Sequence, residues 1–117
     1  MRVLYLTYCS RRKQTAAGML PAIRRYRSRR IRMVAALAAR ERAAFRILSG
    51  KYGLITAGRR IPYYDHLLRP EEVAAMTIRV TPQLHGWQRV VFWYDPTDYL
   101  TPYRAVMRRA AAAAGVP

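Results

Sequence analysis

The sequence predicts a small α/β domain of three layers, with a mainly parallel sheet of at least three strands flanked by helices. Three short runs rich in β-branched and aromatic residues alternate with segments in which apolar residues have helical spacing. Strands that alternate with helices are typical of parallel sheets with crossover helices. The 117 residues suffice for one modest core and are too few for two, so residues 1–117 are expected to form a single domain.

All three predicted strands are apolar almost throughout, which is typical of strands covered on both faces. The first is Val3–Tyr8, which we place at the centre of the sheet, and the others cover residues 45–48 and 90–94. The carboxyl ends of parallel strands meet at one edge of the sheet, where α/β proteins bind ligands. The loops that we expect to meet there cover residues 9–13, 49–65 and 95–99.

The first helix is predicted over residues 28–43. Ser28 can act as its N-cap, and an apolar stripe at helical spacing begins with Ile31. The other members of this stripe are Val34, Ala35, Leu37 and Ala38. Residues 14–21 contain a glycine and a proline and are expected to form a loop, with or without a helical turn.

Two further helices are predicted in the second half of the chain. The first of them covers residues 70–79, opens with a proline and two glutamates, and is broken by the Thr-Pro pair that follows it. The last helix covers residues 101–114, with Pro102 at its first position and Gly115 at its end.

The charge of the chain is extreme for its length. It carries 22 basic and 6 acidic residues, which gives a formal net charge of +16. A folded domain with such an excess usually faces a polyanion, because neutralising phosphates releases condensed counterions. Nucleic acid is the expected partner, with DNA favoured over RNA, and a partner protein is possible in addition. The alternative is that an arginine-rich composition or a need for solubility accounts for part of the charge.

Composition also bears on the compartment. No run approaches the roughly 18 apolar residues of a membrane span, and the first ten residues lack the pattern of a signal peptide. A membrane surface is a weaker candidate than nucleic acid, because the chain has no lipidation motif and no basic helix with a long aromatic face. Cys9 is the single cysteine, so no internal disulfide can form, which favours a reducing compartment. We expect a soluble cytoplasmic protein.

Six arginines lie between residues 24 and 32, around the start of the first predicted helix. Cations at this position oppose the helix dipole, which favours anions at an N-terminus. We therefore interpret the cluster as a phosphate-binding patch, with an ordinary solvated face as the alternative. The arginines expected to contact a nucleic-acid backbone are Arg11, Arg12, Arg24, Arg25, Arg27, Arg29, Arg30, Arg59 and Arg60.

The segment 47–65 holds more polar and titratable side chains than packing requires, and we interpret it as the floor of a site. Only two of the 22 basic residues are lysines, Lys13 and Lys51, and each follows a predicted strand. A lysine is a compact charge whose pKa can move, which a guanidinium cannot imitate, so both are candidates for the site. Chance survival of two lysines on solvated loops is the alternative.

Asp65 is the candidate for a catalytic carboxylate. Near a stacked base, a carboxylate can stabilise positive charge on a sugar as the base departs, or position a water molecule to attack it. The structural alternatives are that Asp65 caps the segment 67–68 or pairs with Arg59 or Arg60. Asp95, in the third loop, is the reserve candidate.

Metal and cofactor chemistry find little support in the sequence. Cys9, His66 and His85 are isolated from one another, and no P-loop or dinucleotide-binding glycine motif is present, so neither a metal nor a cofactor is expected. His66 could act as a base, but a lone histidine in a polar loop is more often a surface residue. Cys9 could be a nucleophile, although a small apolar residue at a strand end is the preferred interpretation. The aromatic residues assigned to the core are Trp87, Trp93 and Tyr103.

Three segments resemble the signature of the YaaA-like proteins, a group of small bacterial and phage domains. They are Cys9-Ser10 followed by Lys13, the run I-L-S-G-K-Y-G-L at residues 47–54, and I-P-Y-Y-D at residues 61–65. The resemblance covers residues 3–70 and implies DNA binding and protection against oxidative damage. A similar K-Y-G and Y-D pattern occurs in domains attached to enzymes that exchange deazaguanine bases in nucleic acid, which implies base chemistry.

The resemblance also indicates which positions match the signature. This chain differs from it in having Gly50 where alanine is usual, which would loosen the loop or let a ligand phosphate approach the backbone. It is also shorter and more basic than many of these proteins. The matched positions are Cys9, Ser10, Lys13, Ser49, Lys51, Tyr52, Gly53, Pro62, Tyr64 and Asp65.

Three functional hypotheses follow. The first is an enzyme that cleaves or exchanges an N-glycosidic bond in DNA, with the target base flipped between Tyr52 and Tyr64 and with Asp65, Lys51 and Tyr52 in catalytic roles. The second is a DNA-binding or protective module without chemistry, and the third is an RNA- or ribosome-associated protein. The residues expected to contact the substrate are Cys9, Ser10, Lys13, Ser49, Gly50, Gly53, Tyr63, Tyr64, Tyr94 and Asp95.

Overall fold

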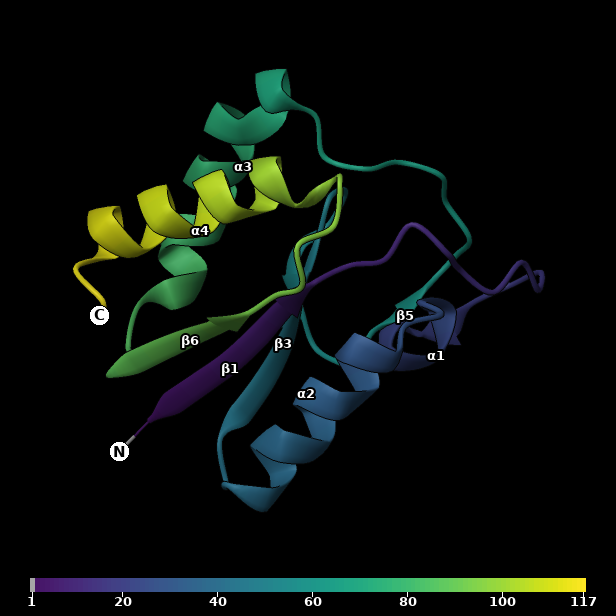
Figure 1. Ribbon diagram of the computed structural model, residues 1–117, viewed down its shortest axis with the longest axis horizontal. Helices are drawn as coiled ribbons and strands as arrows, with labels where there is room; N and C mark the ends of the chain where they lie inside the picture. Colours follow the sequence, from purple (N-terminus) through teal and green to yellow (C-terminus); the bar gives the residue numbers. More distant parts are fainter. Residues whose placement is uncertain (1) are drawn as a thin grey trace.

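A four-stranded sheet forms the middle layer of the protein (Figure 1), whose computed structural model describes residues 2–117. The strands are β1 (Val3–Tyr8), β3 (Ala44–Ser49), β4 (Gly53–Ile55) and β6 (Arg89–Trp93), arranged in the order β4-β3-β1-β6. The central strand β1 pairs in parallel with β3 and β6, whereas β4 runs antiparallel to β3. The predicted α/β class, the mainly parallel sheet and the central place of the first strand are confirmed.

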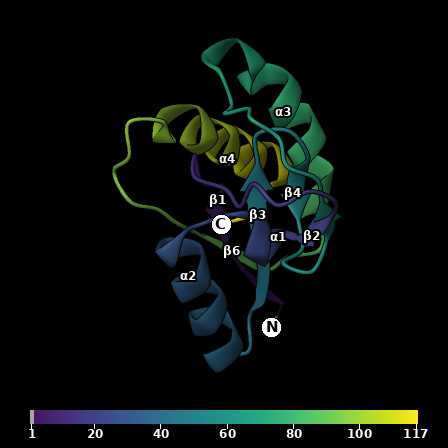
Figure 2. The ribbon, with the colours of Figure 1, turned by 90° about the vertical axis from the view of Figure 1, so that its right-hand side faces the viewer.

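Helices cover both faces of the sheet and complete three layers. Helix α2 (Arg29–Arg40) packs on β1 and β3 from one side, while α3 (Val73–Val80) and α4 (Leu100–Ala114) pack together on the other side (Figures 1 and 2). The core between these layers includes Leu4, Leu6, Ile31, Ile47, Val80, Tyr103 and Val106, all of them buried. None of the helices within residues 2–117 combines the length and the apolar composition that a bilayer crossing requires.

A small lobe lies beyond the carboxyl ends of the parallel strands (Figure 1). It contains the short helix α1 (Ala22–Arg25) and a two-stranded ribbon of β2 (Leu20–Pro21) and β5 (Arg60–Ile61). Residues 14–21 were predicted to form a loop, and strand β2 within them was missed because a strand of two residues carries no periodic pattern. This lobe brings residues 12–29 beside residues 57–64, and it shapes the candidate site.

The N-terminus of α2 is capped as predicted, but the helix ends earlier than predicted. The Ser28 hydroxyl accepts a hydrogen bond from the Ile31 amide at 3.1 Å, which confirms the predicted N-cap. The helix ends at Arg40 rather than at residue 43. Arg42 adopts a positive φ of 58°, and this residue turns the chain from the helix into β3.

The second and third predicted helices also form, with different first turns. Residues Pro70–Glu72 make a 3₁₀ turn ahead of α3, and Thr81–Leu84 make another after it, so the Thr-Pro pair ends the α-helix at Val80. Helix α4 begins at Leu100, which places Pro102 third rather than first. A proline is tolerated there because the amides of the first turn have no partner within the helix.

The expectation that the last strand is buried on both faces was wrong. β6 is an edge strand, and the Trp93 side chain is 37% exposed, because α2 packs on β1 and β3 and leaves this edge uncovered. Trp87 is half-buried beneath the Arg2 guanidinium, whose carbon lies 4.3 Å from the ring centroid. Of the three aromatic residues assigned to the core, Tyr103 alone is fully buried.

Gly50 allows three segments to meet behind the sheet edge. A β-carbon at this position would lie 2.8 Å from the Tyr103 hydroxyl oxygen and 2.9 Å from the Leu68 amide nitrogen. That hydroxyl accepts hydrogen bonds from the Leu68 amide at 3.0 Å and from the Cys9 thiol at 3.1 Å. Close packing of the protein on itself therefore explains this glycine without a ligand.

We expect Gly50→Ala to lower the free energy of unfolding by about 1–3 kcal/mol, because the added methyl group must displace backbone or a buried hydroxyl. Urea unfolding measures the change. Gly58→Ala is the matched control, since nothing lies within 4 Å of a β-carbon at Gly58 and its φ is not positive. Equal stability of the two variants would contradict the packing argument.

Candidate functional site

The S-G-K-Y-G run forms the tight turn between β3 and β4. The Ser49 hydroxyl accepts hydrogen bonds from the amides of Lys51, at 3.1 Å, and Tyr52, at 3.0 Å. Gly53 closes the turn with a φ of +77°, a conformation that favours glycine. Ser49 and Gly53 therefore shape the turn, which leaves Lys51 and Tyr52 as the side chains that it presents.

A buried network of hydroxyls anchors this turn to the small lobe. The Tyr64 hydroxyl lies 2.9 Å from that of Ser49 and 2.5 Å from that of Tyr26. Burial is the main cause that raises the pKa of both tyrosines, so both phenols are neutral at physiological pH. The Tyr52 ring meets the Tyr64 ring edge to face at 5.5 Å. The expected slot for a base between Tyr52 and Tyr64 is therefore absent, because the two rings pack on each other.

Lys51 and Asp65 face a hollow of about 640 Å³, which we call the Asp65 hollow. The exposed Asp65 carboxylate has no hydrogen bond and no ion pair within residues 2–117, although the chain carries 22 basic residues. The predicted alternatives, a cap or a pair with Arg59 or Arg60, are not formed. Asp65 is therefore available to a ligand. Gly50, Tyr64, His66 and Glu72 also line this hollow.

His66 is held by a carboxylate from the turn before α3. Its Nε2 lies 2.9 Å and 3.0 Å from the two oxygens of Glu72, and one of these oxygens accepts a hydrogen bond from the Arg69 amide at 2.8 Å. That amide is the first cause that lowers the pKa of Glu72. Glu72 thus connects His66 to the start of the helix, and the pair lies at the rim of the Asp65 hollow.

Lys13 was predicted to belong to the site, with a solvated loop as the alternative, and its side chain is buried. Its side chain is 8% exposed, and its ammonium lies 4.8 Å from the centroid of the Tyr64 ring. Its one hydrogen bond, to the Arg11 carbonyl, is long at 3.5 Å. Burial is the largest cause that lowers the pKa of Lys13, and the charge of nearby Asp65 opposes it. The ammonium therefore has N–H donors that are not used within residues 2–117 and that lie beside the site.

Cys9 and Ser10 lie in the core and not on a substrate surface. The Cys9 side chain is fully buried and donates to the Tyr103 hydroxyl, while the Ser10 hydroxyl donates to the Arg12 carbonyl at 2.6 Å. The expectation that both contact a substrate is corrected, because their side chains point into the protein. The C-S-x-x-K segment positions Arg12 and Lys13.

Arg25 is a structural residue and not a phosphate contact. Its guanidinium is fully buried and donates to the carbonyls of Gln14 at 2.7 Å, Ala16 at 2.9 Å and Gly18 at 2.7 Å. It also reaches the Ile61 carbonyl at 3.3 Å. Because all of its donors face backbone oxygens, Arg25 fixes the 14–18 loop to the small lobe.

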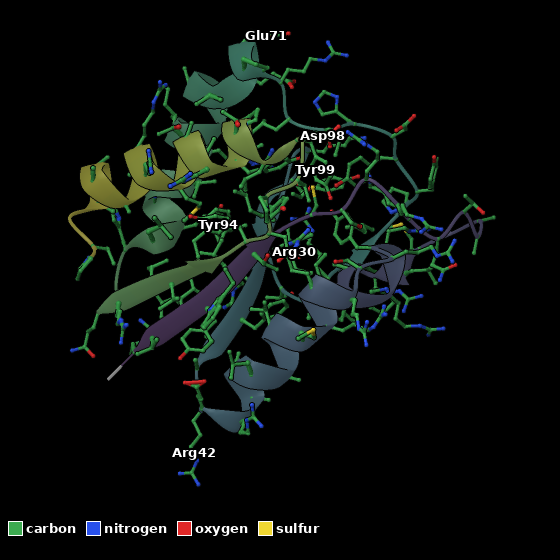
Figure 3. All side chains as sticks on the ribbon, in the orientation of Figure 1. Arg30, Arg42, Glu71, Tyr94, Asp98 and Tyr99 are labelled. Carbon is green, nitrogen blue, oxygen red and sulfur yellow. The ribbon has the colours of Figure 1, made fainter. Side chains whose placement is uncertain are left out.

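Arg30 is also committed within the protein. Its guanidinium donates to the carbonyls of Tyr8 at 2.6 Å and Cys9 at 3.2 Å, and it lies 3.7 Å above the Tyr8 ring (Figure 3). The nearest Asp95 oxygen is 3.9 Å from its Nε. Arg30 therefore fastens α2 to the end of β1, and the predicted phosphate contact is corrected for this residue.

Five other arginines surround a cleft of about 480 Å³, which we call the arginine cleft. All five side chains are exposed, and none forms a side-chain hydrogen bond or an ion pair within residues 2–117. Tyr26, Gln14 and Ser28 complete its lining. Arg32, a member of the predicted cluster around the start of α2, shares a helix face with Arg29 because the two are three residues apart. The five arginines are Arg12, Arg24, Arg27, Arg29 and Arg32.

The remaining predicted contacts lie apart from these two cavities. Arg11 pairs with Asp98 at 3.2 Å and lies over the Tyr99 ring (Figure 3). The Arg104 guanidinium lies over the Tyr94 ring, beside an apolar hollow on α4. Tyr94 therefore does not join Asp65 in one site. Asp95 faces Arg30.

Three further predicted residues lie near the hairpin turn. Arg59 stacks on Tyr52, Arg60 donates to the Met19 carbonyl, and Tyr63 is exposed.

The arginine cleft and the Asp65 hollow share one wall. Tyr26 lines the cleft, Tyr64 lines the hollow, and their hydroxyls are bonded to each other. The Lys13 ammonium lies 5.8 Å from the centroid of the Tyr26 ring and 4.8 Å from that of the Tyr64 ring. Across residues 2–117, no three His, Cys, Asp or Glu side chains gather as a metal site requires. The arrangement is an anion-binding cleft next to an open hollow that holds an unpaired carboxylate.

We expect Lys13→Met to raise the free energy of unfolding by about 1 kcal/mol at pH 7, because it removes a buried charge that has no carboxylate partner. Folding lowers the pKa of Lys13, so the ammonium penalises the folded state below that pKa. The penalty disappears as pH rises through the lowered pKa toward the unfolded value of about 10.4.

Urea unfolding of both proteins from pH 7 to pH 10.5 checks this expectation. The gain in stability from Lys13→Met should shrink as pH rises, while the exposed Lys51→Met serves as a control without such a trend. A variant that is less stable than the parent at pH 7 would show that the contacts of the ammonium outweigh its desolvation.

No protein-family model matches the chain, and no curated protein or solved structure is significantly similar to it. The likeness to the YaaA-like proteins therefore stays a prediction from the C-S-x-x-K, K-Y-G and Y-D segments. Within this fold, those segments form the wall of the arginine cleft, the hairpin turn and the edge of the Asp65 hollow.

Proposed function

We propose that this protein binds DNA through the arginine cleft and cleaves or exchanges the N-glycosidic bond of a base held in the Asp65 hollow. The observation that carries the proposal is the shared wall between the two cavities. On one side of this wall, five arginines have no internal partner within residues 2–117. On the other side, the Asp65 carboxylate has none either. A strand whose phosphates lie in the cleft would bring a neighbouring nucleotide to Asp65.

The charge distribution supports a nucleic-acid ligand. Guanidinium groups match phosphate oxygens in geometry and are weakly hydrated, so exposed and unpaired arginines around a cleft favour phosphate binding. The same binding would be independent of base sequence, because phosphate contacts position a strand and do not read it. A base could stack on the exposed ring of Tyr63 or on the partly exposed Tyr52.

The chemistry in the Asp65 hollow would be electrostatic. As a base leaves deoxyribose, positive charge develops on the sugar, and a carboxylate in contact with the sugar lowers the energy of that state. Asp65 could alternatively orient the water molecule that attacks the sugar. Lys51, from the hairpin turn, would hold a phosphate or a base edge on the opposite side of the same hollow.

We expect the double variant Arg24→Ala/Arg32→Ala to weaken DNA binding at least tenfold near physiological salt, because two phosphate contacts are lost. For each lost contact, the slope of log K against log salt should become shallower by about 0.9 on the duplex and by about 0.7 on a single strand. Fluorescence anisotropy with a labelled single-stranded oligomer, a duplex of the same sequence and the corresponding RNA measures both quantities and ranks the three ligands.

The control is Arg40→Ala/Arg42→Asn, which removes the same charge from the far end of α2. Arg42 points away from the cleft (Figure 3), and asparagine tolerates its positive φ. Residues 29 and 40 are about 16 Å apart along the helix, well beyond the Debye length at this salt. Equal losses in the two double variants would show that net charge, and not the cleft, binds DNA.

The catalytic part is tested with a panel of DNA oligomers that carry uracil, hypoxanthine, oxidised bases and deaza bases. We expect the protein to release one of these bases, seen as a strand break after alkali, and Asp65→Asn to reduce that activity by at least about a hundredfold. Glu41→Gln, at the far end of α2, should leave it unchanged. Full activity of folded Asp65→Asn would remove the assigned role.

A DNA-binding or protective module without chemistry is the second candidate. The observation that favours it is the packing of Tyr52 on Tyr64, which leaves no aromatic slot for a flipped base. This function requires the arginine cleft but not Asp65. Intact strands across the whole panel, together with salt-sensitive binding that Asp65→Asn does not alter, would select it over the enzyme.

A further inference from the structure

Two arginines of the cleft are held directly opposite each other by backbone pairing. Lys13 and Tyr26 form an antiparallel bridge, and the flanking hydrogen bonds run from the Arg27 amide to the Arg12 carbonyl at 2.9 Å and from the Gln14 amide to the Arg25 carbonyl at 2.7 Å. Like charges at opposite positions of paired strands destabilise the pairing. No carboxylate lines the cleft to relieve Arg12 and Arg27.

The first turn of α2 repeats the same unfavourable placement. Arg29 and Arg32 are three residues apart and therefore share a helix face, where like charges repel. They also lie at the positive end of the helix dipole, and this turn contains no acidic residue. The amides of Arg29 and Arg30 have no hydrogen-bond acceptor within residues 2–117. A strong anion in the cleft would relieve the repulsion and accept from these donors.

Side-chain hydrogen bonds of Arg25 and Arg30 hold the backbone around the cleft. The buried Arg25 guanidinium holds the carbonyls of Gln14, Ala16 and Gly18, so the loop that carries Arg12 and Gln14 cannot relax away from α2. Arg30 fastens the first turn of α2 to the end of β1. The backbone therefore keeps the five arginines near one another in the free protein, and a preformed backbone lowers the entropy cost of ordering the site.

We infer that the arginine cleft binds a phosphate monoester, the terminal phosphate of a DNA strand, in preference to an internal phosphodiester. This inference rests on the proposed DNA-binding function and specifies which part of the strand occupies the cleft. A cavity of about 480 Å³ is of the size that holds one small ligand, yet five arginines line it. A terminal monoester carries about −1.5 to −2 charges and three acceptor oxygens at pH 7, whereas an internal diester carries one charge.

The test compares three single-stranded oligomers of one sequence that differ only at their ends. One carries a 5′-phosphate, one a 3′-phosphate, and one hydroxyl groups at both ends, and Kd is measured for each by fluorescence anisotropy at constant salt. We expect one or both phosphorylated oligomers to bind at least about tenfold more tightly than the hydroxyl oligomer. Thymidine 5′-monophosphate, added as a competitor beside thymidine, separates a strand end from a free nucleotide as the source of the monoester.

Variants connect the preference to the cleft. Arg24→Ala/Arg32→Ala should bind all three oligomers with similar Kd values, whereas Arg40→Ala/Arg42→Asn should keep the preference of the parent protein. Equal Kd values for the three oligomers on the parent protein, with a general loss in Arg24→Ala/Arg32→Ala, would overturn the inference and leave the DNA-binding proposal standing.

Other outcomes would support the monoester site and overturn the DNA-binding proposal, or overturn both. If thymidine 5′-monophosphate binds the parent protein in a manner that depends on Arg24 and Arg32, while none of the oligomers binds, the monoester site is supported and the DNA-binding proposal fails. If neither the oligomers nor the mononucleotide binds, both are overturned.

Discussion

The dominant constraint on this protein is that it cannot neutralise its own charge. The chain has 22 basic and 6 acidic residues, and most of the carboxylates already have a partner: Glu41 accepts from Tyr5, Glu72 from His66, Asp98 from Arg11, and Asp95 faces Arg30. Arginines must therefore be accommodated in other ways. Backbone carbonyls and aromatic rings serve as their partners, since both carry partial negative charge.

The two buried guanidinium groups show how this constraint builds the architecture. Arg25 collects the carbonyls of an irregular loop, and Arg30 collects those at the end of β1, where no further strand residue is present to pair with them. Buried carbonyls without a donor would be costly, and a guanidinium offers five donors to satisfy them. Other exposed arginines, such as Arg40, Arg42, Arg108 and Arg109, also lack an internal partner within residues 2–117. What distinguishes the five arginines of the arginine cleft is that they line one cavity.

The wall between the two cavities joins structural and functional parts in the same way. Tyr64 bonds to both Tyr26 and Ser49, so buried hydroxyl groups connect the small lobe, the hairpin turn and the sheet edge. The Lys13 ammonium lies near both rings of this wall and close to Asp65, but without an ion pair. A ligand that spans the wall would therefore contact two surfaces that these buried hydroxyl groups join.

The sequence by itself determined the α/β class, the central strand, the Ser28 cap and the concentration of arginines at the start of α2, because periodicity, capping and composition are local properties. It also singled out Lys13, Lys51 and Asp65 by residue type. Only the tertiary structure decided which arginines are free, since neighbouring residues such as Arg24 and Arg25 have the same side chain and opposite environments. That difference arises from which carbonyls the folded chain brings within reach, and hydrogen bonds from arginine to carbonyl groups join residues up to 84 positions apart.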